Sequence, residues 1–420
     1  MHPATTERNR CPSGHILDVG GATAFALLRT AGLKLQRLSQ TRLQPAGWVR
    51  YSVKKRMISA TTRKDDTVPE PHLDHETAFA DRMRTMLNEA CLALQTSVGH
   101  QAGLFDTMAD LAPSTSAEIA AAAGLDERYV REWLAAMTVG GIVGYDAGYG
   151  TYTLPPAHAA SLTRAGVGNQ ASMTQYIAMM GEVEQRVLAA FRDGRGVPYS
   201  AYPRFQQLQG EESARTFDSA LVASILPLVP GLVDRLKQGM AVLDVGTGQG
   251  HAVNVLAREF PASSFLGVDL SETGIAAARD EARMWGLTNV SFTVADTARL
   301  DGQYDLVTAF DVIHDSARPD AILSAIHRVV RPGGVYLMGD TACSSHLEDN
   351  VGHPFGPALY TFSVFYCMSV SLAQDGAGLG TMWGRQDALA KLAAAGFTDV
   401  TTKQRPDDPM DLYFIAHKSQ

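Results

Sequence analysis

The residues with the clearest chemical meaning stand in one short stretch, AVLDVGTGQG, which runs from Ala241 to Gly250. In it, Asp244 is followed by glycines at alternate positions, among them Gly246 and Gly248. Glycine lets a backbone turn tightly and approach a ligand without an obstructing Cβ. A dinucleotide-binding loop has the spacing G-x-G-x-x-G and places a pyrophosphate at a helix N-terminus. The spacing here is different, and the acidic residue before the loop favours a ligand that carries positive charge.

More polar side chains follow at the ends of later strand-like stretches. The stretch FLGVD ends at Asp269, where a carboxylate can accept both hydroxyls of a ribose. Asp296 follows VSFTVA and suits the exocyclic amine of an adenine. The stretch YDLVTAFDVIHD carries Phe310 and Asp311 at its end and continues to His314, which can exchange a proton near neutral pH. Ligands of open α/β sheets sit beyond the carboxyl ends of the strands, so we expect these side chains around one site.

The elements that would position these residues alternate between short apolar stretches and helical patterns from Met240 onward. Such alternation is typical of a doubly wound, largely parallel sheet. We predict a Rossmann-like α/β domain over residues 239–420 with a mostly parallel seven-stranded sheet. Its strands are expected near 241–245, 264–269, 290–295, 304–310, 334–339, 398–404 and 411–417.

The N-terminal half has a different pattern, which predicts a winged-helix domain over residues 73–164. Apolar residues recur at helical spacing in the stretch that begins ETAFADRM at Glu76. A short helix capped by Ser116 and a second helix from about Asp126 to Val139 are expected next. Two strand-like pieces, GIVGY and GTYTL, then surround a glycine-rich turn.

A winged helix suggests DNA binding, but the charges of this region argue against it. A DNA-binding surface needs a basic face that replaces the counterions of the phosphates. Between residues 116 and 154, only Arg128 and Arg131 stand against five acidic residues. We therefore expect a packing and dimerisation domain and no nucleic-acid partner.

Residues 165–238 are predicted to form a mostly helical connector that roofs a pocket. An aromatic-rich break, GVPYSAYPRFQQL, interrupts the helical pattern and supplies Tyr199, Tyr202 and Phe205. An insert before the last helix supplies four more aromatic candidates, Phe355, Tyr360, Phe362 and Phe365. Aromatic faces suit a flat or cationic ligand. We expect Tyr199, Tyr202 and Phe362 at the pocket, with ordinary core packing as the alternative for each.

Length and composition limit the possible classes of protein. The 420 residues suffice for two or three domains, and a hydrophobic content of 45% supports a proper core. The net charge of −8 disfavours general attraction to nucleic acid or acidic membranes. No apolar run reaches the roughly 20 residues of a membrane helix. The four cysteines form no CxxC pair, so neither a zinc site nor a disulfide framework is expected. These features predict a cytoplasmic protein without a membrane partner.

The first 56 residues differ from the rest in charge, with +8 against −16. An arginine-rich, acid-poor leader is typical of an organelle transit peptide, so a mitochondrial location is the alternative. The other interpretation is a disordered extension upstream of a start at Met57. We assign residues 1–72 to a leader and linker that we expect to be disordered.

The order and spacing of the C-terminal motifs resemble those of class I S-adenosylmethionine (SAM) dependent methyltransferases. The resemblance rests on D-x-G-x-G-x-G, on the later strand-end acids and on RVVRPGGVYLMGD. A dehydrogenase would also place an acid after its second strand, but the whole set favours a methyltransferase. The resemblance implies SAM as the cofactor. The residues expected to bind it are Asp244, Gly246, Thr247, Gly248, Gly250, Asp269, Leu270, Asp296, Thr297, Phe310 and Asp311.

The segment FDVIHDSARPD resembles the HD segment of small-molecule O-methyltransferases from plants and bacteria, which also have a winged-helix dimerisation domain. The resemblance implies a homodimer in which His314 is the general base for a phenolic hydroxyl. In other class I methyltransferases a histidine in this turn only packs or bonds the backbone, and that role stays open. Ser316 stands where the plant enzymes have tryptophan. The insert after it is closer to an uncharacterised bacterial group of winged-helix methyltransferases.

We therefore predict methyl transfer to a small-molecule acceptor, preferentially to a hydroxyl oxygen, by in-line displacement. The alternatives are transfer to nitrogen, carbon or sulfur of a metabolite, and a SAM-sensing winged-helix transcriptional regulator. No metal is expected, because Asp311, Asp315 and Asp340 match no defensible ligand spacing.

Overall fold

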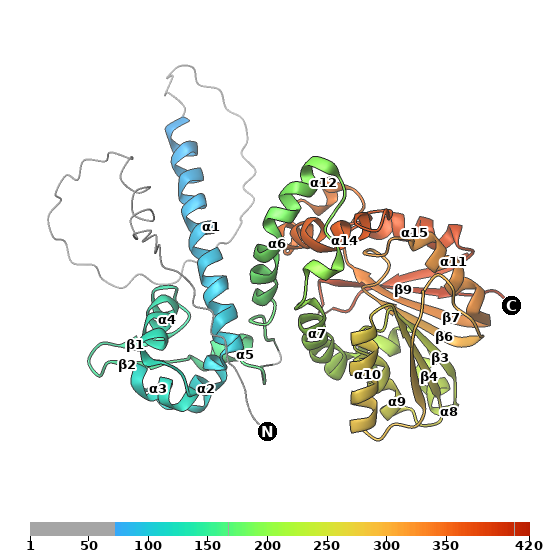
Figure 1. Ribbon diagram of the computed structural model, residues 1–420, viewed down its shortest axis with the longest axis horizontal. Coiled ribbons are helices and arrows are strands. Elements are labelled where there is room, and N and C mark those ends of the chain that lie inside the picture. Colours follow the sequence, from blue (N-terminus) through green and yellow to red (C-terminus); the bar gives the residue numbers. More distant parts are fainter. Residues whose placement is uncertain (1–71, 167, 407) are drawn as a thin grey trace, which may run out of the picture. The chain divides into compact units, whose positions relative to one another are not determined.

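The computed structural model describes residues 72–166, 168–406 and 408–420 (Figure 1). The predictions of a transit peptide, a disordered leader and a start at Met57 concern residues outside the described ones.

A small helical domain with a β-hairpin comes first. Its core gathers around Trp133, whose ring meets Phe105 edge-on at 5.2 Å and whose indole N–H donates to the Gln95 carbonyl at 2.8 Å. The two strands pair antiparallel, as a winged helix requires. The elements are α1 (His72–Gln101), α2 (Leu104–Asp110), α3 (Ser116–Ala123), α4 (Glu127–Val139), β1 (Gly144–Asp146), β2 (Thr151–Thr153) and α5 (Pro156–Leu162).

The cap of α3 differs from the prediction by one residue, because Thr115 and not Ser116 holds that position. The Thr115 hydroxyl accepts from the Glu118 N–H at 3.3 Å, and the Glu118 carboxylate accepts from the Thr115 N–H at 2.8 Å. Such a reciprocal capping box requires an acid three residues after the cap, which only Thr115 has here. Asp126 caps α4 as the sequence predicts.

The arginines of α4 are paired within the helix. Arg128 lies 2.5 Å from Glu132, and Arg131 lies 3.2 Å from Glu127, both at the i,i+4 spacing. Their charges are therefore compensated locally, which weakens the case for a DNA-binding surface on this helix.

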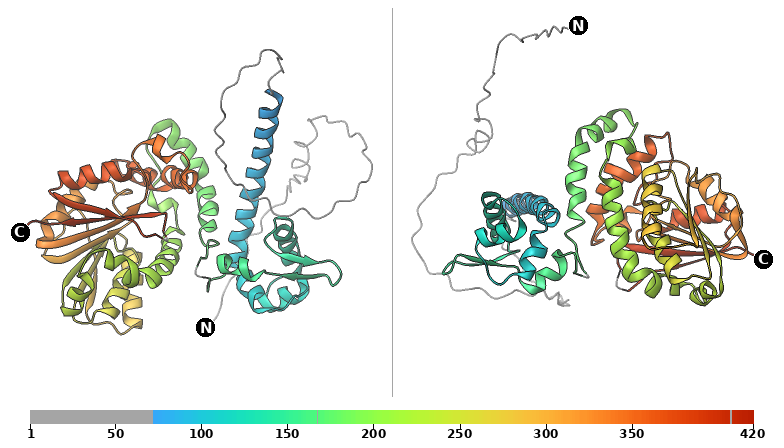
Figure 2. Two further views of the ribbon diagram at one scale, coloured as in Figure 1. Left: turned by 180° about the vertical axis from the view of Figure 1, so that it is seen from behind. Right: turned by 60° about the horizontal axis from the view of Figure 1, so that its bottom comes forward.

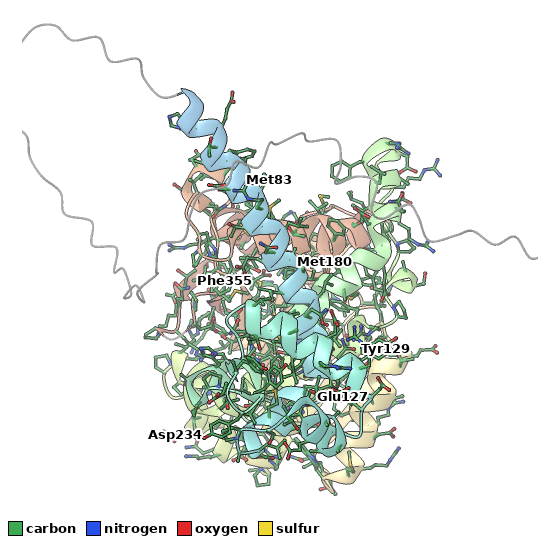
Figure 3. The ribbon with its side chains drawn as sticks, turned by 90° about the vertical axis from the view of Figure 1, so that its left-hand side faces the viewer. Met83, Glu127, Tyr129, Met180, Asp234 and Phe355 are labelled. Carbon is green, nitrogen blue, oxygen red and sulfur yellow. The ribbon has the colours of Figure 1, made fainter. Side chains whose placement is uncertain are left out.

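The apolar stripe of α1 has the predicted helical spacing but is exposed in the single chain. Phe79 and Leu87 are 63% and 65% exposed, and Met83, Met86 and Leu94 are exposed as well. Met83 lies along this helix in Figure 3, as Tyr129 does on α4.

The connector is mostly helical, as predicted. Its elements are α6 (Thr174–Asp193), the 3₁₀ turn η2 (Tyr199–Ala201), α7 (Phe205–Ala220), the π-helical turn η3 (Leu221–Ile225), the 3₁₀ turn η4 (Leu226–Leu228) and α8 (Leu232–Gln238). Among the described residues no single helix is long and apolar enough to cross a membrane. One pair bent by 106°, Phe205–Leu228 with Leu232–Gln238, meets that criterion by length and composition only.

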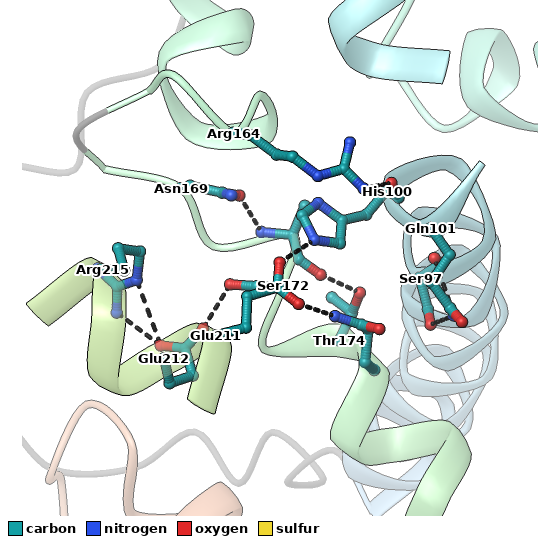
Figure 4. Close-up of polar contacts among 12 residues, drawn as sticks. Ser97, His100, Gln101, Arg164, Asn169, Ser172, Thr174, Glu211, Glu212 and Arg215 are labelled. Carbon is teal, nitrogen blue, oxygen red and sulfur yellow. Dashed lines mark hydrogen bonds and ion pairs between the residues drawn. The ribbon is translucent and has the colours of Figure 1, made fainter. Parts of the chain in front are cut away.

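A polar junction ties α1, α6 and α7 together (Figure 4). The buried His100 ring nitrogen Nε2 lies 2.6 Å from one Glu211 oxygen, and the Gln175 amide donates to the other at 3.0 Å. The next residue, Glu212, pairs with Arg215 at 2.7 Å. The junction fixes the N-terminal half of α7, which lines the cavity described below.

The C-terminal domain holds the predicted seven-stranded sheet, in the order β5-β4-β3-β6-β7-β9-β8. The strands β3 to β7 run parallel, and β9 is antiparallel to both of its neighbours. The strands are β3 (Ala241–Val245), β4 (Ser264–Asp269), β5 (Val290–Val294), β6 (Tyr304–Phe310), β7 (Val330–Thr341), β8 (Asp399–Lys403) and β9 (Asp411–His417).

Helices cover both faces of this sheet (Figure 2). The helices of this domain are α9 (His251–Glu259), α10 (Glu272–Met284), α11 (Pro319–Val329), α12 (Leu347–Asn350), α13 (Gly356–Phe362), the π-helical turn η5 (Ser363–Cys367), α14 (Met368–Leu372) and α15 (Gly384–Ala394). One core packs α8, α9 and α10 against the strands, and the other packs α11 and α15 against them.

Two glycines of this domain have a left-handed backbone conformation. A comparison of their alanine variants tests how tightly the core packs against the glycine loop. Gly250 has φ 73°, and a Cβ there would lie 2.4 Å from the Ala278 Cβ and 2.7 Å from Phe292. Gly286 has φ 67° with open space around it. We expect Gly286→Ala to cost about 1–2 kcal/mol of backbone strain. Gly250→Ala should cost about 1–3 kcal/mol more through overpacking. Urea unfolding measures both, and equal losses would contradict this packing argument.

Candidate functional site

The glycine loop between β3 and α9 is hydrogen-bonded to the neighbouring strand β4. The N–H groups of Gly246 and Thr247 donate to the Val268 carbonyl at 2.8 and 3.0 Å. A Cβ at Gly246 would lie 2.4 Å from Val312, so that glycine is required for packing. At Gly248, with φ 56°, no atom lies within 4 Å of such a Cβ. Gly248 is thus a point of the loop where open space lies beside the backbone.

Two of the predicted acids flank this loop. Asp244 is buried at the end of β3 and accepts the Thr308 hydroxyl at 2.6 Å. Burial raises the pKa of the Asp244 carboxyl to about 6, although the bond from Thr308 opposes the shift. Asp269 accepts from the Gly248 N–H at 2.8 Å and from the Ser271 N–H at 2.7 Å. It therefore connects the loop to the start of α10 while facing the cavity.

A cavity of about 1700 Å³ lies at the carboxyl ends of the parallel strands. Pockets for one small molecule are typically about 300–1,000 Å³, so the volume allows a cofactor and an acceptor together. Residues of α7, α13 and η5 are among those that line it. The predicted residues that line it are Asp244, Gly246, Thr247, Gly248, Gly250, Asp269, Leu270, Thr297, Phe310, Asp311, His314, Tyr199, Tyr202 and Phe362.

Asp296 is the one predicted site residue that the structure does not bring to the cavity. Its carboxylate accepts from the Ala298 N–H at 3.0 Å and pairs with Arg318 at 2.8 Å. These two partners, the N–H first, lower the pKa of Asp296. In this arrangement its neighbour Thr297 lines the cavity and Asp296 does not.

His314 forms a buried pair with Asp340, a residue at the end of β7. The His314 Nδ1 lies 2.8 Å from Asp340 Oδ1, which also accepts from the Trp383 indole N–H at 3.0 Å and the Thr341 N–H at 2.8 Å. Because Nδ1 is bonded to Asp340, Nε2 is the imidazole nitrogen that stays available for proton transfer. Burial opposes protonation of the ring, yet the Asp340 carboxylate holds the pKa of His314 well above its usual range. The Cys367 thiol is a further polar neighbour of this ring.

The same region holds a group with metal-ligand geometry. Asp311, His314 and Asp340 bring one ligand atom each within 4.8 Å of one another. Asp311 has φ 55°, an uncommon conformation for a residue with a side chain. Two carboxylates and an imidazole could hold a divalent cation. Coordination through Nδ1 would have to displace the bond to Asp340.

The aromatic side of the cavity is organised around Tyr366, a residue that the sequence analysis missed. Its ring stacks on Phe205 at 3.7 Å and meets Tyr202 and Tyr199 edge-on at 4.9 and 5.9 Å. The Tyr202 hydroxyl donates to the Phe365 carbonyl, so its polar end is already used.

The insert also departs from the predicted pattern. Phe355 and Phe362 line the cavity, whereas Tyr360 and Phe365 are not among its lining residues. Tyr360 lies in α13, and Phe365 lies in the π-helical turn η5.

Comparisons with known proteins agree with this architecture. Residues 90–164 match the model of an Rv2258c-like winged HTH domain. Residues 236–360 match the model of a methyltransferase domain.

Curated relatives match part of the chain. An arsenite methyltransferase of Aquipseudomonas alcaligenes is 33% identical over 186 residues, which are 40% of this chain and 51% of the relative. A fatty-acid O-methyltransferase of Mycolicibacterium smegmatis is 35% identical over 103 residues, which are 24% of this chain and 38% of the relative. The chain thus spans about half or less of the length of these relatives.

Solved structures share the fold over most of the chain. Human N-acetylserotonin methyltransferase in complex with SAM superimposes with a TM-score of 0.62 at 19% identity, covering 81% of this chain and 98% of that one. The mitomycin 7-O-methyltransferase MmcR gives 0.61 at 16% identity, with 82% and 99% covered. Together, the two domain matches and the sheet order identify the chain as a winged-helix protein with a Rossmann-like methyltransferase domain.

Proposed function

We propose that this protein is a SAM-dependent methyltransferase that acts on a hydroxyl oxygen of a small molecule. The observation that carries the proposal is that one cavity joins the open glycine loop to the buried His314–Asp340 pair. Among the similar proteins, several carry the name O-methyltransferase, and one is complexed with SAM.

The residues beside the loop fit SAM. The open space at Gly248 is a place where a ligand can lie against bare backbone. Asp269 keeps acceptor capacity for ribose hydroxyls beside its two backbone bonds. Asp244 adds negative charge next to the loop, which suits an ammonium group. When bound, SAM supplies an activated methyl group on a sulfonium.

His314 would take the proton from the acceptor hydroxyl as the oxygen attacks the methyl carbon. A phenol and an ordinary imidazole differ by about 3.5 pKa units, or about 5 kcal/mol. The Asp340 carboxylate narrows this gap by stabilising the imidazolium that forms. Alignment of the reacting atoms can contribute about 7–11 kcal/mol, so positioning would be the larger effect. Acceptors that react through nitrogen, carbon or sulfur would depend less on His314.

We infer that the exposed stripe of α1 binds a second copy of the chain. Phe79, Met86, Leu87 and Leu94 repeat along one helix with no cover in the single chain. Contiguous exposed apolar surface of this kind usually marks an interaction site. A two-fold pairing of α1 with itself would bury the stripe on both protomers.

The glycine loop gives the first test. Gly248→Ala should weaken SAM binding at least about tenfold, because its Cβ would enter the ligand space. The melting temperature should fall only as much as in Gly286→Ala, which shares the left-handed strain and lies outside the cavity lining. Calorimetric titration with SAM measures the affinity. Unchanged affinity in Gly248→Ala would place the cofactor elsewhere.

The His314–Asp340 pair gives the second test, through the pH dependence of kcat/KM. A base must be neutral, so activity should rise with pH through a His314 pKa that lies above 6.5. Asp340→Asn keeps the shape but removes the charge, so this rise should move to lower pH. His314→Ala should lower kcat by about 10²–10⁴ and abolish the rise, with SAM binding retained.

The pKa values of Asp311 and Asp315, which line the same cavity, are raised to about 6 and about 7, so the assignment to His314 rests on how the two variants change the rise and not on the rise alone. A loss below tenfold in His314→Ala would assign His314 a structural role.

The α1 stripe gives the third test. Leu87→Asp should convert a dimer into a monomer in analytical ultracentrifugation, because a carboxylate cannot be buried without a partner. Asn88→Asp, which places the same carboxylate nearly opposite the stripe on an exposed position of this helix, should leave the dimer intact. A wild-type protein that sediments as a monomer would rule out this interface.

A further inference from the structure

The helix α7 packs directly on the glycine loop and runs beside α9 (Figure 1). The side-chain amide of Gln249, in the loop, donates to the Gln206 carbonyl of α7 at 2.7 Å. A Cβ at Gly210 would lie 2.5 Å from the Gln249 side chain, so helix and loop are in close contact there. Further along α7, the Phe217 ring lies 5.1 Å from the ring of Phe310. Residues of α7 and of the loop line the same cavity, so a cofactor against the loop lies between the two.

The C-terminal half of α7 is connected to α10 through one histidine at the start of α9. The His251 Nδ1 lies 2.8 Å from Glu281 Oε1 on α10, and its Nε2 lies 3.2 Å from Asp218 Oδ1 on α7. A carboxylate only accepts hydrogen bonds, and a neutral imidazole has a single N–H to donate. Only the imidazolium can therefore bond both carboxylates at once. We call this arrangement of Asp218, His251 and Glu281 the histidine bridge.

The surroundings of the bridge favour the charged ring. Burial opposes protonation of His251, but the carboxylates of Glu281 and Asp218 raise its pKa above the usual value. Burial also raises the pKa of Glu281, but the donors around it, His251 first, lower it overall. A further charge is that of Arg258 on α9, which lies 4.4 Å over the Trp285 ring that His251 meets edge-on at 5.6 Å. Because the pKa of His251 is raised, the bridge is complete at low pH and is lost as the pH rises through that pKa.

We propose that His251 is a positioning residue that holds α7 closed over the bound cofactor and slows its release. Loss of the bridge frees the C-terminal half of α7, while the bond between His100 and Glu211 still holds the N-terminal half. The inference rests on the proposed function and assigns the retention of SAM to a contact between helices. It adds no demand on His314 or on the acceptor.

The test measures how fast labelled S-adenosylhomocysteine, the product that SAM leaves after methyl transfer, dissociates from the full chain. The bound label is chased with excess unlabelled compound at pH 6 and pH 9, on either side of the usual range of a histidine. We expect faster release from the wild type at pH 9. The amine of the ligand and Asp244 also titrate in this range, but they are the same in every variant. The comparison between variants therefore isolates the bridge.

Asp218→Ala removes the α7 end of the bridge at an exposed position. At pH 6 this variant should release the ligand about three- to fivefold faster than the wild type, the range of a partly exposed ion pair. At pH 9, where the wild-type bridge is already lost, the two rates should agree. His251→Gln cannot carry a charge and should behave like Asp218→Ala.

Asp280→Ala on α10 is the matched control. It removes an exposed carboxylate, paired with Arg283, from the position next to Glu281. Its release rate should equal that of the wild type at both pH values. Both aspartates are exposed, so the two alanine variants should have similar melting temperatures.

The outcomes separate the two proposals. If S-adenosylhomocysteine does not bind the wild type and labelled SAM transfers no methyl group, the proposed function fails and the role of His251 fails with it. If the ligand binds but leaves Asp218→Ala at the wild-type rate at pH 6, the role of His251 fails alone. Equal acceleration in Asp280→Ala overturns it as well, because the effect would then follow net charge and not the bridge.

Discussion

The buried carboxylate of Asp340 is the constraint on which the site depends. One of its oxygens accepts from an imidazole, an indole and a backbone N–H that belong to different segments. A fully buried charge is tolerated only when such donors surround it, and removal of one partner would leave it costly. The end of β7, the turn after β6 and the start of α15 are therefore held together by one atom. The orientation of His314 toward the cavity follows from that arrangement.

The second requirement is that the acidic side chains of the site meet in one place, and the parallel sheet provides it. Since β3, β4, β6 and β7 run in the same direction, their carboxyl ends deliver Asp244, Asp269, Asp311 and Asp340 to one edge. Acids gathered in this way repel one another, and burial makes the repulsion stronger. Local partners resolve most of it, namely Thr308 for Asp244 and two backbone N–H groups for Asp269. Asp311 and Asp315 have no such local bonds among the described residues, and both line the cavity.

Prediction from the sequence succeeded where the signal was local. Four of the seven strands have the predicted bounds, and the alternation of glycines located the loop, because strand periodicity and tight turns are short-range properties. The cap of α3 was misplaced by one residue because Thr115 and Ser116 are both good caps, and only the position of Glu118 decides between them. The prediction of a helix at the apolar stripe of α1 was confirmed. The periodicity of the stripe does not say whether the chain itself or another molecule covers it.

The sequence by itself determined the order of the elements, the glycine loop and the place of His314, since each depends on neighbours a few residues away. The tertiary structure alone decided the partners. Asp340 lies 26 residues from His314 in the chain, and no spacing rule links them. Asp296 pairs with Arg318, 22 residues further along the chain, and it is not among the residues that line the cavity. Tyr366 lies in the π-helical turn η5 and packs in one core cluster with residues of α6 and with Tyr202, and these are contacts between distant segments that local sequence does not encode.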